Sequence, residues 1–147
     1  MFRNILIPVD GSPISRKAIK GAVQLAKEQK ARVTGLYVAP PYRPEYREEM
    51  SVAQFVTPQA HTAMTKEISR KVLQAVERAA TAAGVRCDTL YAEGLFPFEQ
   101  ILRTARQKKC DLIYMASHGR RGFARLLLGS ETSKVLAHSP VPVLVCR

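Results

Sequence analysis

The sequence predicts an α/β fold: a doubly wound, open, five-stranded parallel sheet with helices on both faces, of the Rossmann-like type. Two observations predict it. Short apolar runs without polar alternation are typical of strands buried on both faces, and amphipathic helical patterns separate most of these runs. Such alternation implies right-handed crossover connections. The 147 residues show no block of differing composition, so we expect a single domain spanning residues 1–147.

The first strand and the first helix are separated by a short turn. An apolar run from Ile5 to Val9 predicts the strand. Ser12 is a favourable N-cap and Pro13 suits the first helical position, so we expect the helix to begin there and Asp10 to lie at the carboxyl tip of the strand. The apolar stripe of the helix consists of Ile14, Ala18, Ala22 and Leu25.

A second strand is predicted over residues 32–38, and a long loop follows it. Prolines at 40, 41 and 44 exclude regular structure, and the loop extends roughly to Pro58. Connections beyond about 12–15 residues are uncommon in compact domains, so a lid, a partner surface and a disordered flap are all open interpretations. Three aromatic residues either cover a ligand or fasten the loop to the core, namely Tyr42, Tyr46 and Phe55.

The middle of the chain predicts a long helix and a third strand. Apolar residues at helical spacing from about His61 to Ala83 predict the helix, and Gly84 is well placed to end it. The residues predicted to face inward are Met64, Ile68, Val72, Leu73, Val76 and Ala80. Residues 85–92 predict the strand, with Leu90 on the face opposite to Cys87, Thr89 and Tyr91.

The last third of the chain predicts two helices and two strands. Pro97 opens a helix that carries Lys108 and Lys109 in its last turn, where cations suit the helix dipole. Residues 112–116 predict the fourth strand and residues 130–138 a short helix. Residues 143–146 predict the terminal strand.

A phosphate site is predicted in residues 111–130, where a glycine-bearing basic loop joins the fourth strand to the short helix. Backbone N–H groups at a helix start are unpaired and carry part of the helix dipole, so they form a binding site for an anion. Ligands of doubly wound sheets bind beyond the carboxyl ends of the strands, where strand order reverses. Asp10 ends the first strand and Ser117 follows the fourth, so the site requires these two strands to be neighbours.

The glycines of this loop are weak evidence when taken alone. At an average usage of about 7%, a glycine pair with the spacing of Gly119 and Gly129 is expected about 0.7 times in this length. The buried strand before the loop and the helix start after it favour a site, while the alternative is that Gly119 and Gly122 are ordinary turn glycines and Ser130 an ordinary cap. The patterns G-x-x-x-x-G-K-[ST] and G-x-G-x-x-G are absent at the expected places, which argues against a kinase, a GTPase or an ordinary dinucleotide dehydrogenase.

Three stretches together resemble the universal stress protein family: NILIPVDGS at the start, LYV after the first helix, and IYMASHGRRGFARLLLGSETSKVLAHSPVPVLVCR at the end. The resemblance covers essentially the whole chain and implies the adenine nucleotide alpha hydrolase-like form of the fold. The nucleotide-binding branch of the family has a Gly-x2-Gly-x9-Gly-[Ser/Thr] pattern, which maps onto Ala116, Gly119, Gly129 and Ser130.

The resemblance also implies ATP as the ligand and names its contacts. The nucleoside would be contacted by Asp10 and the backbone of Val38, and the phosphates would be held by Gly119, Gly129, Ser130 and the Glu131 amide. Asp10 has an alternative role as a turn-forming carboxylate. Ala116 replaces the first glycine of the pattern and cannot adopt positive φ cheaply, yet we expect binding to survive because alanine is the smallest departure.

The loop is basic and offers no evident catalytic residue. Its cations suit a polyphosphate, although a solvated loop would also be basic; they are His118, Arg120, Arg121 and Arg125. The sequence pairs no nucleophile with His118, and His61 and His138 lack metal-ligand spacing, so no residue is predicted to be catalytic and slow ATP hydrolysis stays open. A Mg²⁺ ion would be held by the phosphates, because the loop has no carboxylate cluster.

Composition narrows the class of protein further. The net charge of +11 is spread over the helical segments, which favours a solvated basic surface over a nucleic-acid partner. Three widely spaced cysteines suggest neither a disulfide framework nor a metal knuckle. The apolar runs are far shorter than the ~20 residues of a membrane helix, and the chain starts directly with a strand. We therefore expect a cytoplasmic protein without a membrane partner.

The terminal strand predicts how the chain assembles. It is short and apolar and is expected at a sheet edge, where it can pair with a second copy. Proteins of the family are typically dimers through the corresponding strand, so the resemblance implies a homodimer; burial under a helix of the same chain is the alternative.

The leading functional hypothesis is an ATP-binding sensor or regulator of a stress response. The second is a family member that binds no nucleotide and acts through protein–protein contacts, which the alanine at position 116 favours. The third is a weak nucleic-acid binder, which rests on net charge alone.

Overall fold

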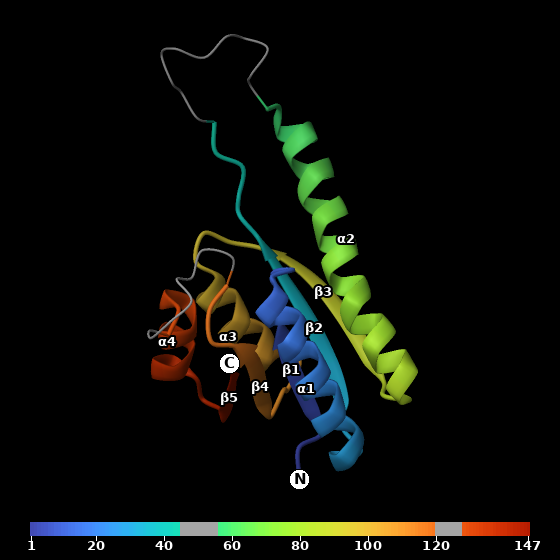
Figure 1. Cartoon of the computed structure of the whole chain (residues 1–147). Helices are drawn as coiled ribbons and strands as arrows, with labels where there is room; N and C mark the ends of the chain where they lie inside the picture. The colour runs from blue at the N-terminus through green and yellow to red at the C-terminus, as the bar shows by residue number, and fades with distance from the viewer. Residues whose placement is uncertain (45–55, 120–127) are drawn as a thin grey trace.

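The protein contains a parallel sheet of five strands in the order β3-β2-β1-β4-β5. The structure is a computed structural model and describes residues 1–44, 56–119 and 128–147. The strands are β1 (Asn4–Pro8), β2 (Arg32–Ala39), β3 (Cys87–Glu93), β4 (Leu112–Ala116) and β5 (Val143–Cys146), and the helices are α1 (Pro13–Gln29), α2 (Pro58–Ala83), α3 (Pro97–Gln107) and α4 (Ser130–His138) (Figure 1). The predicted fold class is confirmed, and β4, α4 and β5 have their predicted bounds.

The central strand β1 pairs in parallel with β2 on one side and with β4 on the other. From β1 the chain moves outward through β2 to β3, and it then crosses the sheet to β4 and β5. Strand order therefore reverses between β1 and β4. The adjacency that the predicted site requires is confirmed, since the carboxyl ends of these two strands lie side by side.

Helices cover both faces of the sheet (Figure 1). A separate apolar cluster lies under the helices of each face. Under α1 and α2 lie Ile5, Ile7 and Val33, all 0% exposed. Under α3 and α4 lie Leu6 and Leu36, 0% and 1% exposed. Successive side chains of a strand point to opposite faces, and both faces of β1 are covered, so this strand has no polar alternation.

A hydroxyl N-cap followed by proline starts both α1 and α2. The Oγ of Ser12 accepts a hydrogen bond from the N–H of Ser15 at 3.1 Å, which confirms the predicted start of α1. Thr57 caps α2 in the same way, with its Oγ1 accepting a backbone N–H at 3.1 Å. Because of this cap, α2 begins at Pro58 and the prediction of a start near His61 is wrong.

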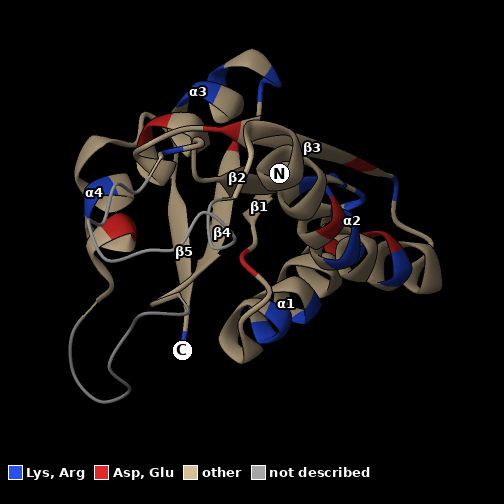
Figure 2. Cartoon of the chain, turned by 90° about the horizontal axis from the view of Figure 1, so that it is seen from above, with Lys and Arg blue, Asp and Glu red and all other residues tan. Residues whose placement is uncertain are grey.

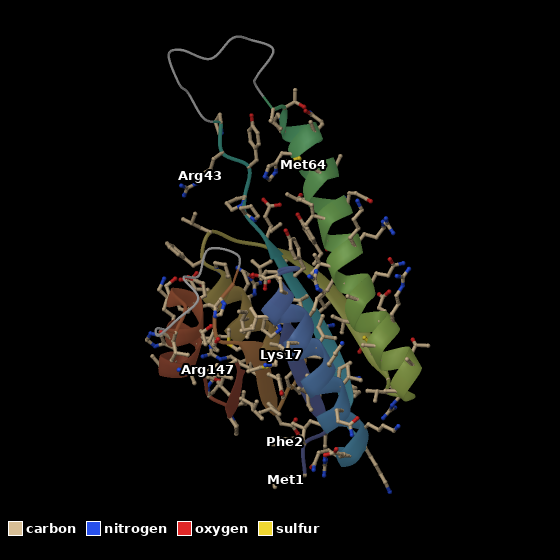
Figure 3. The ribbon with its side chains drawn as sticks, in the orientation of Figure 1. Met1, Phe2, Lys17, Arg43, Met64 and Arg147 are labelled. Atoms are coloured by element: carbon tan, nitrogen blue, oxygen red, sulfur yellow. The ribbon has the colours of Figure 1, made fainter. Side chains whose placement is uncertain are left out.

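Two predicted helix faces differ from those in the structure. The first turns of α2 extend beyond the sheet (Figures 1 and 3), so Met64, predicted to face inward, is 53% exposed. In α1 the buried face is turned relative to the prediction: Ile14 and Leu25 are half-buried, while Ile19 and Val23 are buried. Ala18 and Ala22 belong to both the predicted and the observed apolar face of α1. For that reason the sequence pattern did not distinguish the two faces.

The end of α3 also differs from the prediction. Lys108 is the C-cap of the helix, with its N–H donating to Thr104 O at 2.9 Å, and Lys109 lies outside with a φ of 51°. The next N–H, that of Cys110, donates back to Ala105 O at 2.8 Å. The chain has to turn here to enter β4, so the two lysines follow the last turn instead of lying in it.

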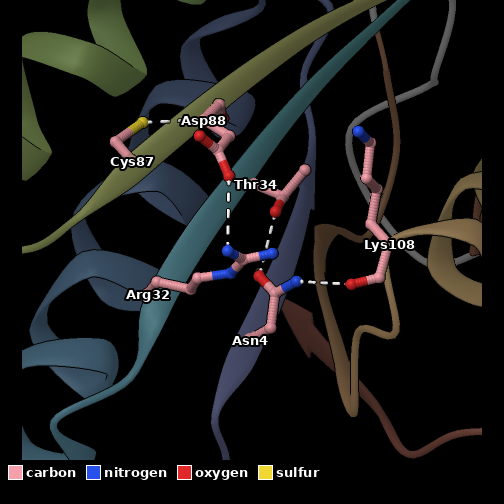
Figure 4. Close-up of polar contacts among 6 residues, drawn as sticks. All are labelled: Asn4, Arg32, Thr34, Cys87, Asp88 and Lys108. Carbon is pink, nitrogen blue, oxygen red and sulfur yellow. Dashed lines mark hydrogen bonds and ion pairs between the residues drawn. The ribbon is translucent and has the colours of Figure 1, made fainter.

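A buried polar network joins the amino ends of the central strands (Figure 4). Asn4 is 4% exposed. Its Nδ2 donates to Lys108 O at 2.9 Å, and its Oδ1 accepts from the hydroxyl of Thr34 at 2.9 Å. The carboxylate of Asp111 accepts the backbone N–H groups of Arg3 and Asn4 at 2.8 and 3.0 Å. These contacts connect β1 to β2 and to the turn before β4.

The two described ends of the loop between β2 and α2 contact each other. The hydroxyl of Tyr42 donates to Val56 O at 2.9 Å, and its ring lies 5.5 Å from the ring of His61. Tyr42 therefore holds the ends of the loop together. Tyr46 and Phe55, the other aromatic residues of this loop, lie outside the described residues.

The strand β5 forms one edge of the sheet, as predicted. Its apolar residue Leu144 is 38% exposed, so the described residues leave this side chain partly uncovered. The chain end is fixed to α1 by a hydrogen bond from Lys17 Nζ to Arg147 O at 2.5 Å, and both residues are labelled in Figure 3.

The surface carries cations on every helix. Lysine and arginine are spread over α1, α2, α3 and α4 with few acidic residues among them (Figure 2). Among the described residues the cations are spread over the helices, as the sequence predicted. None of the helices among the described residues has the length and apolar character needed to span a membrane.

The three cysteines are free thiols. Cys110 is buried, and Cys87 and Cys146 are half-buried. Burial raises the pKa of the Cys87 and Cys110 thiols to about 11, so both are protonated at neutral pH. The three thiols therefore lie in or near the core of the protein.

Candidate functional site

The site begins at the turn that follows β1. The N–H of Ser12 donates to Asp10 Oδ1 at 2.9 Å, and the N–H of Asp10 donates to Ser15 Oγ at 3.3 Å. Gly11, which lies between Asp10 and Ser12, has a φ of 80°, an angle that residues other than glycine rarely adopt. Asp10 therefore does form the turn, as the alternative interpretation proposed, and one of its carboxylate oxygens is used for that purpose.

The second carboxylate oxygen of Asp10 faces the loop after β4. A Cβ atom on Gly119 would lie 2.6 Å from Oδ2 of Asp10, a distance that real Cβ atoms essentially never show. Only glycine permits this close approach. The structure thus brings together two predicted site residues that are far apart in the sequence, and a turn-forming role for Asp10 is compatible with a role in the site.

The far end of the glycine loop returns to its beginning. The N–H of Gly129 donates to Ser117 O at 2.7 Å. A Cβ on Gly129 would lie 3.1 Å from His118 Cα and 3.3 Å from Ser117 O, and these atoms belong to the backbone. Gly129 is therefore packed tightly against the segment that leaves β4. The charged residues Arg120, Arg121 and Arg125 lie outside the described residues.

The start of α4 lies at this closure. Gly129 is its N-cap, and no side chain caps the helix. The hydroxyl of Thr132, which is 3% exposed, donates to Ala116 O at 3.0 Å and so fixes the first turn to the end of β4. The backbone N–H groups of Ser130 and Glu131 lie in that turn, where a helix has no internal acceptors for them. Such a start can bind an anion.

Ala116 occupies the last position of β4 and pairs with Cys146 of β5. It is 9% exposed. Among the described residues the positive φ angles belong to Gly11, Lys30, Gly84 and Lys109, so Ala116 has no need of the backbone freedom of glycine. The expected conformational cost of alanine at this position is absent.

Val38 lies on β2, the other neighbour of β1. It is half-buried and packs on the side of the sheet covered by α3 and α4. The N–H of Val9 donates to Leu36 O at 2.9 Å, which places the end of β1 beside this part of β2. Val38 and Ala116 are therefore on opposite sides of β1, and a ligand contacting both would lie across the end of that strand.

One contact near the site was not found by sequence reasoning. Ser117 Oγ and His118 Nδ1 are 3.1 Å apart, although the sequence paired no hydroxyl with this histidine. The signal in the sequence for this contact was that Ser117 and His118 are neighbours and directly follow a buried strand. Ser117 is 5% exposed and its N–H donates to Cys146 O at 2.8 Å, so the backbone of Ser117 continues the pairing of β4 with β5. Among the described residues no group of three histidine, cysteine or acidic side chains is placed to hold a metal ion.

Comparison with known proteins gives consistent relatives over the full chain. The family model described as "Universal stress protein family" matches residues 1–147. A universal stress protein of Methanocaldococcus jannaschii is 34% identical and covers 100% of this chain and 83% of its own length. Universal stress protein YxiE of Bacillus subtilis is 36% identical over 100% of both chains.

Solved structures share the fold. The universal stress protein UspA from Lactobacillus plantarum has a TM-score of 0.78 at 28% identity and covers 99% of this chain and 97% of its own. Two more distant structures are a universal stress protein in complex with cAMP, with a TM-score of 0.70 at 22% identity, and one from Archaeoglobus fulgidus in complex with dAMP, with 0.68 at 16%. They cover 99% of this chain and 97% and 98% of their own. At these identities the two complexes establish the likeness of the fold alone.

Proposed function

The chain belongs to the universal stress protein family, and from this premise we propose that it binds ATP at the carboxyl ends of β1 and β4. We propose further that it acts in the cytoplasm, as a single domain, as a sensor or regulator of a stress response. The approach of Gly119 to Oδ2 of Asp10 carries the proposal, because it joins the two halves of the predicted site beside a helix start that no side chain caps.

The proposed roles follow the positions of the residues. Asp10 and the backbone of Val38 contact the nucleoside, with the ligand lying across the end of β1 and over Ala116. The phosphates are held by Gly119, Gly129, Ser130 and the Glu131 amide. Mg²⁺ is bound through the phosphates, since oxygen ligands of the nucleotide suit it and it retains several waters.

One observation supports a ligand at this place, and a second supports an adenine nucleotide as that ligand. The site lies where strand order reverses, which is the usual ligand position in doubly wound sheets. The cAMP and dAMP complexes of two distant neighbours show that these proteins of the same fold hold adenine nucleotides. The competing hypothesis, an interaction module without a nucleotide, depended on Ala116, and the strand conformation of that residue weakens the part of the argument that concerns its backbone.

We propose a sensor in preference to a rapid enzyme. Fast hydrolysis requires a group positioned to activate water. Of the described residues at the site, His118 contacts the buried Ser117 hydroxyl, and the Asp10 carboxylate accepts the N–H of Ser12. His118 Nδ1 and one oxygen of the Asp10 carboxylate are thus used in contacts within the protein, and the other oxygen is assigned to the nucleoside, so we expect at most slow turnover.

Calorimetric titration with Mg-ATP tests the proposed function. We expect saturable binding with one site per chain and a Kd in the micromolar range, about −7 to −8 kcal/mol. GTP in the same titration serves as the control for base recognition. Absence of binding at millimolar Mg-ATP would refute the proposal. Steeply salt-dependent binding of RNA without competition by ATP would instead support the nucleic-acid hypothesis.

We also propose that the chain forms a homodimer through β5. The edge position of the strand and the exposure of the apolar Leu144 support it, because an uncovered apolar edge favours pairing with a second copy. Leu144→Glu is expected to weaken the dimer at least about tenfold through unpaired buried charge. Sedimentation velocity over a concentration series measures the change.

The matched control for the dimer is Leu95→Glu, at an apolar residue that is 49% exposed and lies before α3, away from β5. It should sediment like the wild-type protein. If Leu144→Glu remains a folded dimer with the wild-type dissociation constant, the interface is elsewhere.

A further inference from the structure

The side chain of Glu131 joins the start of α4 to the start of α3. Its Oε2 accepts the backbone N–H of Phe98 at 2.7 Å, and its Oε1 lies 3.2 Å from Lys134 Nζ. Glu131 belongs to the first turn of α4, whereas Phe98 lies 33 residues earlier in the chain. One carboxylate therefore connects two helices on the same face of the sheet.

The start of α3 requires this acceptor. Its N-cap residue, Phe96, makes no side-chain cap hydrogen bond, and Pro97 has no N–H to donate. Phe98 thus carries the first N–H of the helix, and a helix start leaves such groups without internal partners. Glu131 supplies a charge-assisted acceptor at the positive end of the α3 dipole, and it acts as the cap of a helix to which it does not belong.

The charge of Glu131 is neutralised by its partners. A carboxylate in the first turn of α4 would repel a phosphate bound to the N–H groups of the same turn. Here the carboxylate oxygens contact the Phe98 N–H and the Lys134 ammonium instead. Lys134 Nζ also lies 5.3 Å and 5.8 Å from the ring centres of Phe98 and Phe96, which orients the lysine toward α3. The acidic residue is thus compatible with an anion site.

The first turn of α4 is held in place by few hydrogen bonds. The helix has 9 residues, and helices of this length have little stability of their own. Hydrogen bonds from Gly129 N to Ser117 O and from Thr132 Oγ1 to Ala116 O hold the turn to the end of β4. The Glu131 carboxylate adds a hydrogen bond to the start of α3, beside the apolar packing of Val135 against the residues of that helix. Without it, the turn keeps its attachment to β4 and this apolar packing but loses the polar contact between the two helix starts.

We propose that Glu131 is a positioning residue for the phosphate end of the site: by capping α3, its carboxylate fixes the direction of the backbone N–H groups of Ser130 and Glu131. This inference rests on the proposed ATP site and deepens it, because it assigns the side chain of Glu131 a role separate from that of its amide.

Three variants test the inference by calorimetry with Mg-ATP and with adenosine. Glu131→Ala is expected to weaken Mg-ATP binding about tenfold, the scale of a lost hydrogen bond to a charged group, and to change adenosine binding less than about twofold. Glu131→Gln should recover most of the affinity, since an amide oxygen still accepts the Phe98 N–H. Glu99→Gln is the matched control, because Glu99 is an exposed acid in the first turn of α3 and should bind like the wild type.

Hydrogen exchange of the Phe98 amide, followed by NMR without nucleotide, provides a second readout. Glu131→Ala should accelerate it at least about tenfold and Glu99→Gln should not. Unchanged exchange, or tighter Mg-ATP binding by both Glu131 variants, would overturn the positioning role. If the wild type binds Mg-ATP and Glu131→Ala binds equally well, this inference alone fails. If the wild type does not bind, the ATP site fails and the positioning role fails with it.

Discussion

Replacing Gly119 by valine is expected to reduce the affinity for Mg-ATP at least about a hundredfold while the protein stays folded. The Cβ alone would lie 2.6 Å from Oδ2 of Asp10, so the carboxylate has to move away from the position in which we propose that it contacts the ligand. The two methyl groups then occupy the space between the ends of β1 and β4. Gly119 is exposed, and for that reason the loss should appear in binding and not in folding. Calorimetry measures the affinity and circular dichroism the fold.

Two further variants make this experiment specific. Gly119→Ala adds only the Cβ and should give a smaller loss than valine. Ala82→Val adds the same kind of bulk at an exposed position near the end of α2 and should bind Mg-ATP like the wild type. If a folded Gly119→Val protein binds with wild-type affinity, the nucleotide does not contact this loop and the proposed site is in the wrong place.

Replacing Asn4 by leucine is expected to lower the free energy of unfolding by about 3 kcal/mol. The substitution leaves the hydroxyl of Thr34, which is 0% exposed, and the carbonyl of Lys108 without the partners that Asn4 provides. Leaving a buried polar group unsatisfied costs about 1–3 kcal/mol for each group. Urea denaturation followed by circular dichroism measures the change.

Thr34→Val serves as the matched variant for Asn4. In the double variant the hydroxyl of Thr34 is removed together with its partner Asn4. The loss in the free energy of unfolding should therefore be smaller than the sum of the losses in the two single variants. A loss below about 0.5 kcal/mol for Asn4→Leu would show that the network contributes little to stability.

The elements of the fold were largely predictable because their signals are local. The start of α1 follows from Ser12 and Pro13, and the strands follow from apolar runs that are buried on both faces. The errors occurred where distant parts of the chain determine the end of a helix or the exposure of a side chain. α3 ends before Lys109 because the chain has to enter β4 there, and Met64 is exposed because α2 extends beyond the sheet. Neither reason is contained in the residues near the error.

The site was predictable as a set of strand ends and glycines, but its internal contacts were not. The requirement that β1 and β4 be neighbours follows from the hypothesis, whereas their adjacency comes from the structure. The contact of Gly119 with Asp10 joins residues that share no local pattern. The contact of the Glu131 carboxylate with Phe98 likewise depends on how α3 and α4 pack, so the sequence indicated the amide of Glu131 and missed its side chain.

The buried network around Asn4 lies at the amino ends of the strands, and the proposed site lies at their carboxyl ends. The hydrogen bonds of Asn4 and those of the Asp10 turn thus lie at opposite ends of the sheet. Substitutions that change the ligand preference of the site can accumulate at one end without weakening the contacts that hold the sheet together at the other. The fold thereby separates evolutionary change in recognition from loss of stability, and a family built on it can diversify its ligands on an unchanged frame.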